Sequence, residues 1–162
     1  MKRFILFLAL VSLFLSGCKS NSKPGIEGYV IKKEDRGMLV VASVPKDFSS
    51  TGGLKEFYNA IWFSNAPKKV QVGQRVQVWF DLVMESYPGQ AKATKISILP
   101  SKKPKGANLT EAAAIRKALE SPEISPQSVP AIKKGTYDHK SDVWNIVIIQ
   151  SETEIKVQIE DK

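Results

Sequence analysis

The sequence is poor in the residues that build redox, metal and acid–base sites. It contains one cysteine, Cys18, and one histidine, His139. A single cysteine excludes a disulfide within one copy of the chain. A zinc site needs three or four ligands, which are mostly cysteine or histidine. His139 lies in the polar stretch 138–142 and is interpreted as a hairpin-loop residue. We therefore expect no catalytic triad, no metal and no cofactor.

Other common catalytic patterns are also missing. No glycine-rich phosphate loop occurs, and Ser86 lacks the glycine pattern of a nucleophile elbow. Asp81 and Glu85 lie four residues apart and are the one carboxylate pair considered for glycoside hydrolysis. Many exposed acidic pairs share this spacing, so the sequence favours a noncatalytic protein, with a carboxylate-based envelope hydrolase as an alternative.

The net charge of +8 is not concentrated on one element. The basic excess is spread over the polar stretch 19–24, the region 25–100 and the basic proline-containing connector 101–106. A nucleic-acid binder would gather its lysines and arginines on one face with interleaved aromatic residues. The distribution predicts no nucleic-acid partner. It suits either an anionic membrane or wall polymer, or simple solubility.

The chain has only one long apolar run, over residues 4–15, which follows Lys2 and Arg3. Twelve residues span about 18 Å as a helix, which is too short for a hydrocarbon core of about 30 Å. The run is therefore typical of a signal peptide. We assign residues 1–17 to that signal peptide.

Leu15-Ser16-Gly17-Cys18 directly follows the apolar run and resembles the lipobox of bacterial lipoproteins. The resemblance implies cleavage between Gly17 and Cys18, with a diacylglyceryl group on the Cys18 thiol. Residues 18–24 would then form a tether to the extracytoplasmic face of the cell membrane. The alternative is an ordinary secretory signal followed by an incidental cysteine.

The region 25–100 reads as a set of short strands. Apolar or alternating segments at 26–33, 38–43, 60–64, 75–81 and 91–99 are separated by turn residues. One helical turn is expected at 54–58. Five short strands without a long helix indicate an OB-like Greek-key barrel, with a small sandwich as the alternative.

The region 107–162 changes to helical periodicity before returning to strands. Asn108 is a candidate N-cap, with Glu111 as its capping-box partner. Ile115 and Leu119 follow at helical spacing. The segments 132–137, 143–149 and 155–160 predict an antiparallel hairpin or meander packed on that helix. The whole chain is thus mainly β, in the α+β class, with a small second domain at 107–162.

Two family resemblances accompany these patterns. Segments 28–30, 60–63, 72–79 and above all Glu85-Ser86-Tyr87-Pro88-Gly89-Gln90 resemble the YobA-like lipoprotein domain of Gram-positive bacteria, over about residues 25–100. This resemblance implies export and an OB-like barrel but no activity. Residues 110–115, 144–148 and 155–159 more weakly resemble a PepSY-like module, which implies inhibiting or holding an exported enzyme. The proline-rich stretch 122–130 departs from that pattern.

Exposed aromatic residues are the candidates for a ligand site. Trp62, Trp79 and Tyr87 lie on or near strands that face ligands in OB barrels, and Glu85 and Gln90 would supply polar contacts. Packing of the same rings in a core is the competing interpretation. We expect a membrane-anchored, noncatalytic binding module whose partner is an envelope protein, a peptide or a wall polymer. An inhibitor or accessory of an envelope hydrolase or protease is the alternative.

Overall fold

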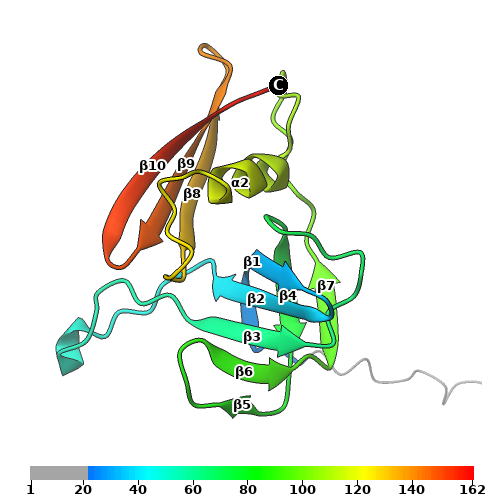
Figure 1. The fold of residues 1–162 in the computed structure, drawn as a ribbon, viewed down its shortest axis with the longest axis vertical. Coiled ribbons are helices and arrows are strands. Elements are labelled where there is room, and N and C mark those ends of the chain that lie inside the picture. Colours follow the sequence, from blue (N-terminus) through cyan, green and yellow to red (C-terminus); the bar gives the residue numbers. More distant parts are fainter. Residues whose placement is uncertain (1–21) are drawn as a thin grey trace, which may run out of the picture.

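The computed structural model describes residues 22–162, so the expected signal peptide, Gly17 and Cys18 lie outside the described residues. Its strands and helices, labelled as in Figure 1, are β1 (Ile26–Glu34), β2 (Gly37–Ala42), the 3-10 turn η2 (Ser49–Thr51), β3 (Ala60–Ser64), β4 (Arg75–Trp79), β5 (Val83–Met84), β6 (Gly89–Lys92), β7 (Lys95–Ile98), α2 (Glu111–Leu119), β8 (Ala131–Asp138), β9 (Val143–Gln150) and β10 (Thr153–Glu160). Within residues 22–162, no helix has the length and apolar character to cross a bilayer. The predicted mainly β, α+β class is confirmed.

Strands β1 to β7 form a closed barrel. β1, β2 and β3 are an antiparallel meander, and β4 pairs with the other side of β1. β6 runs parallel to β3, whereas β7 runs antiparallel to β4. Between them, the Ala93 amide donates to the Ser64 carbonyl and the Thr94 amide donates to the Trp79 carbonyl. The segment 89–98 therefore acts as one bent fifth strand that closes an OB-like Greek key.

Alternation along the strands gives the barrel two apolar faces. Val30, Val40 and Phe63 point inward and are buried in the barrel core. Ile31 and Leu39 point outward, yet they are buried too, because they join the core of the C-terminal unit. β2 is apolar on both faces for this reason. The C-terminal unit thus covers the outer face of β1 and β2.

The C-terminal unit is a helix packed on a three-stranded sheet of order β10-β9-β8 (Figure 1). Ile115 of α2 is fully buried in one core cluster with Trp144, Ile146 and Val157 of the sheet, and Leu119 and Ile159 pack partly buried against it. This is the packing that the helical and alternating periodicities predict. The described residues form the expected meander in full.

A loop of the barrel joins the two units. Gly73 has a positive φ of 86°, and a Cβ at this position would lie 2.1 Å from the carbonyl oxygen of Ala112 in α2. Only glycine permits so close an approach together with this backbone conformation. Next to it, the Arg116 side chain donates from Nε to the Val72 carbonyl at 3.1 Å. The loop before β4 is thereby fixed onto α2.

Two local predictions are wrong. Residues 54–58 form no helical turn; instead Phe57 bridges Lys46 across the loop, and a 3-10 turn lies earlier, at η2. The helix cap is Thr110, whose hydroxyl accepts from the Ala113 amide at 3.3 Å. Asn108 is not the cap because its amide groups bind Asp161 near the C-terminus.

Candidate ligand-binding clefts

The five candidate residues do not gather at one site. Trp62 and Gln90 line one cleft, Tyr87 lines another, Trp79 lies where the N-terminal segment meets the barrel, and Glu85 is exposed on the loop after β5. They belong to different elements: Trp62 to β3, Trp79 to β4, Gln90 to β6, and Glu85 and Tyr87 to the loop between β5 and β6. Each location has its own chemistry.

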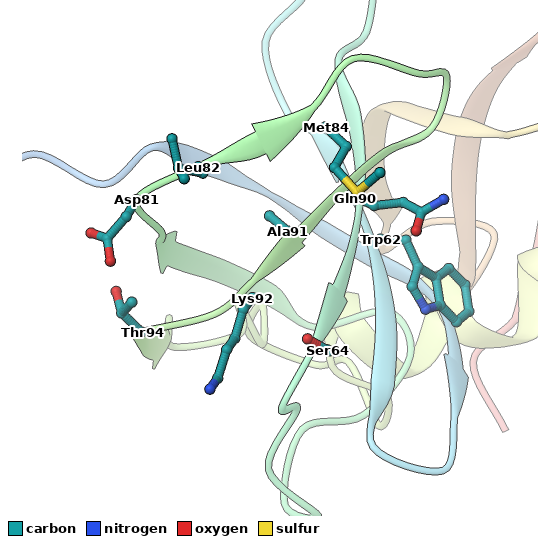
Figure 2. Close-up of a pocket in the computed structure, with 9 residues that line it drawn as sticks. All are labelled: Trp62, Ser64, Asp81, Leu82, Met84, Gln90, Ala91, Lys92 and Thr94. Atoms are coloured by element: carbon teal, nitrogen blue, oxygen red, sulfur yellow. The ribbon is translucent and has the colours of Figure 1, made fainter.

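The Trp62 cleft, of about 470 Å³, lies on the outer side of β3 and β6 beside β5 (Figure 2). Trp62 is opposite Gln90 in the β3–β6 pair, so their side chains share one face. Figure 2 shows Trp62, Met84 and Gln90 at one end of the cleft, and Asp81 and Thr94 at the other. Asp81 is the only carboxylate among its lining residues, and Glu85 is not among them. The predicted Asp81–Glu85 pair is therefore not assembled in this cleft.

Trp79 lies at the end of β4, outside the barrel core. Its indole Nε1 donates to the carbonyl of Ser22 at 2.7 Å, and Lys95 Nζ sits 4.3 Å from the indole centroid. The Gly25 amide donates to the Val78 carbonyl at 3.0 Å. The predicted alternation along this strand is correct, since Val76 and Val78 face the core. Trp79 thus holds the described start of the chain against the barrel.

A second cleft, which we call the aromatic cleft, lies between the barrel and the C-terminal unit and has a volume of about 490 Å³. The barrel side contributes Leu54, Glu56, Phe57, Tyr58, Tyr87 and Pro88, and the C-terminal unit contributes Gln127, Ser128, Val129, Ala131, Ile149, Ser151 and Glu152. Sites that accept small ligands are often apolar, concave and formed between two units, with a few polar groups that orient the ligand. This cleft has each of those features.

Phe57, Tyr58 and Tyr87 line one side of this cleft, and Phe48 packs on Phe57 from outside the lining. Phe57 packs against Phe48 with centroids 5.6 Å apart and against Tyr87 with centroids 5.7 Å apart. Tyr87 is 55% exposed and Phe48 41% exposed. The Tyr87 hydroxyl donates to the Tyr58 carbonyl at 3.3 Å, which fixes the ring direction. Burial of the hydroxyl raises the pKa of Tyr87, so the phenol is neutral at physiological pH.

Some of the charged groups at the rim of the aromatic cleft form ion pairs with each other. Glu56 is held by Lys133 at 3.0 Å, and Lys133 also contacts Glu154 at 3.4 Å. These partially exposed charges link the β2–β3 loop to β8 and β10. The hydrogen bond from Lys133 to Glu56 outweighs the cost of desolvation and raises the pKa of the lysine. The Lys133 ammonium therefore stays charged across the neutral range.

The β9–β10 turn brings Glu152 to the cleft in an unusual conformation. Gln150 and Thr153 are paired, so Ser151 and Glu152 form a two-residue hairpin loop. Their φ values are 49° and 65°. This type I′ geometry is typically occupied by Asn-Gly, because non-glycine residues are strained there. Strained residues of this kind are often kept at functional sites.

His139 lies in the hairpin turn between β8 and β9. Asp138 accepts from the Lys140 amide at 2.9 Å and from the Ser141 hydroxyl at 2.8 Å, and Asp142 accepts from the Tyr137 hydroxyl at 2.6 Å. Over residues 22–162, no three histidine, cysteine or carboxylate side chains come together in a way that could hold a metal ion. The two acids beside His139 are thus engaged within the turn.

The barrel is also the part of the chain that other sequences resemble. Residues 27–100 match the model of a protein family of unknown function, DUF3221. This range covers β1 to β7 almost completely and ends before α2. No curated protein and no solved structure matches the chain. The match is confined to residues 27–100, and the description of that family gives no activity.

Sequence reasoning identified Tyr87 but missed the other residues of the aromatic cleft. Phe57 and Tyr58 lay in a segment expected to be helical, and Ile149 lay on a strand expected to be core. The cleft combines four stretches that are far apart along the chain. One feature of the sequence could have indicated this cleft: Phe57 and Tyr58 are adjacent aromatic residues in an otherwise polar loop.

Proposed function

We propose that the protein is a lipid-anchored, extracytoplasmic binding module and that the aromatic cleft is its ligand site. The anchor is supported by the sequence Leu15-Ser16-Gly17-Cys18 after a short apolar run and by the YobA-like resemblance of residues 25–100. The binding role is supported above all by one observation: the rings of Phe57 and Tyr87 pack together and line a cleft of about 490 Å³.

The chemistry of this cleft favours a sugar-containing wall polymer as the ligand. An exposed ring offers its π face to the apolar C–H side of a sugar or to an apolar peptide side chain. Glu152, Gln127 and Ser128 offer acceptors and donors to hydroxyl groups. The basic residues elsewhere on the barrel favour approach to an anionic envelope polymer. A peptide or protein ligand would use the same rings.

Removal of one ring tests this proposal. Tyr87→Ala in the mature lipoprotein should weaken binding to purified wall sacculi about tenfold, because an exposed aromatic contact is removed while the core stays intact. Co-sedimentation with the sacculi measures the affinity, and thermal unfolding checks the fold. Trp62→Ala is the matched control, since it removes a partly exposed ring from the other cleft. Equal binding by wild type and Tyr87→Ala would refute the site.

An envelope hydrolase is the alternative that one observation favours, because Glu56 and Glu152 both line the aromatic cleft. A glycosidase uses two carboxylates on opposite sides of the scissile bond. The ion pair of Glu56 with Lys133 opposes this role, as it holds one carboxylate away from acid–base work. Release of reducing ends from sacculi by the wild type, lost in Glu152→Gln, would establish the hydrolase. The binding module releases none.

The PepSY-like resemblance of residues 107–162 supports a different alternative, in which the protein holds or inhibits an exported enzyme. The exposed face of β8 to β10 would then be the contact surface. Specific co-purification of a secreted hydrolase with the protein, unaffected by Tyr87→Ala, would favour this role over polymer binding.

A further inference from the structure

A short apolar segment at the β5 end of the barrel is largely exposed to solvent. Leu82, Val83 and Met84 are consecutive and are 84%, 45% and 68% exposed. β5 is joined to the barrel only by the pairs Val83–Ala91 and Met84–Gln90. Isolated exposed apolar residues are ordinary on protein surfaces, but three in succession are unfavourable in water unless they serve a contact. Leu82 and Met84, the most exposed of the three, are therefore available for contact with another surface.

The described start of the chain lies close to this segment. The Ser22 carbonyl accepts from Trp79 Nε1, and Leu82 follows Trp79 by three residues, which is at most about 11 Å of chain. Cys18 precedes Ser22 by four residues, so the Cα atoms of the two residues are at most about 14 Å apart. A membrane anchor at Cys18 therefore keeps the bilayer within reach of the β5 end of the barrel.

The charges around the segment suit the surface of an anionic bilayer. Lys23 and Lys95 are exposed beside Trp79, and Lys92 lines the adjoining Trp62 cleft. Tryptophan and lysine are favoured at the level of lipid headgroups. Asp81 and Glu85 lie at the two ends of the apolar run and restrict it to shallow contact, since a carboxylate resists entry into hydrocarbon.

We propose that Leu82 and Met84 dock into the headgroup region of the membrane to which the protein is anchored. This inference rests on the proposed lipid anchor and specifies how the anchored protein is oriented. In Figure 1 the β5 end and the β8–β10 sheet lie at opposite ends of the long axis. Docking through β5 therefore points the β8–β10 sheet away from the bilayer. The hydrophobic gain from two partly buried side chains adds to the anchor and fixes one orientation.

Site-specific fluorescence tests the docking. The lipidated protein carrying Leu82→Cys, with a polarity-sensitive dye on that thiol, is reconstituted in phosphatidylcholine–phosphatidylglycerol vesicles that contain a lipid with a nitroxide near the headgroup. Lys156→Cys, exposed on β10, is the matched control. Quenching at position 82 should exceed quenching at position 156 several-fold, and adding Met84→Glu should reduce it to the control level.

The outcomes separate the anchor from the docking. Equal quenching at positions 82 and 156, in protein that mass spectrometry shows to be acylated at Cys18, would overturn the docking and leave the anchor intact. Protein without an acyl group at Cys18 would overturn both. Strong quenching that persists after Met84→Glu would also contradict the docking, because it would come from proximity rather than from insertion of this segment.

Discussion

At the residue scale, single side chains connect parts of the chain that are distant in sequence. Asp161 accepts from the Leu109 amide at 2.8 Å and from Trp144 Nε1 at 3.1 Å, and it also accepts from the Asn108 amide. Burial would raise the pKa of Asp161, but these donors outweigh it and lower the pKa. One carboxylate thus fixes the end of the chain to the approach to α2.

Tyr137 gives a prediction at this scale. Its hydrogen bond to Asp142, with some desolvation, raises the pKa of Tyr137 to about 12. Because the folded state prefers the neutral phenol, this contribution to stability is complete below about pH 10 and is lost as the pH rises through about 12. A phenolate absorbance titration of wild type minus Tyr137→Phe should show this shift.

The matched variant for that titration is Asp142→Asn, which keeps a hydrogen-bond acceptor but removes the charge. It should bring the Tyr137 pKa back toward about 10. A wild-type Tyr137 that already ionises near pH 10 would show that the hydrogen bond to Asp142 is not kept in solution.

At the element scale, the β9–β10 turn is strained at the edge of the aromatic cleft. Replacing Glu152, at φ 65°, by glycine should raise the free energy of unfolding by about 1 kcal/mol, because glycine adopts this conformation without strain. Urea denaturation measures the change. Gly52→Ala is the matched control with the opposite sign, since Gly52 has φ 80° and open space around it. A loss of stability in Glu152→Gly would show that the Glu152 side chain stabilises the turn.

Several elements were predictable from the sequence and others were not, for physical reasons. The strand at Ala60–Ser64 and the alternation over residues 155–160 of β10 follow from local apolar patterns, and these predictions are confirmed. The Asn108 cap failed because Asp161, 53 residues away, takes its amide groups. The helical turn at 54–58 failed because Phe57 pairs with Lys46 and stacks on Phe48 and Tyr87. Local secondary-structure propensity contains no information about contacts with residues that are distant in the sequence.

At the scale of the whole molecule, the two units form one packed body. Outward-facing residues of β1 to β3 share a core cluster with α2 and the three-stranded sheet. Gly73 and Arg116 fix the barrel loop to the helix, and Lys133 joins Glu56 on the opposite side. Because both units line the aromatic cleft, its shape depends on this interface. The covered outer face of β1 and β2 is unavailable to ligands, and it includes part of the β2–β3 surface that OB barrels often use for binding.

The most direct test of the account is to map where a wall glycan touches the protein. Backbone amide resonances of the mature protein are followed by NMR while soluble wall-glycan fragments are added. The account predicts shifts clustered at Phe57, Tyr87, Ile149 and Glu152, with Leu82 and Met84 unaffected. Shifts confined to Trp62, Leu82 and Met84, or no shifts at any concentration that the fragments allow, would contradict it.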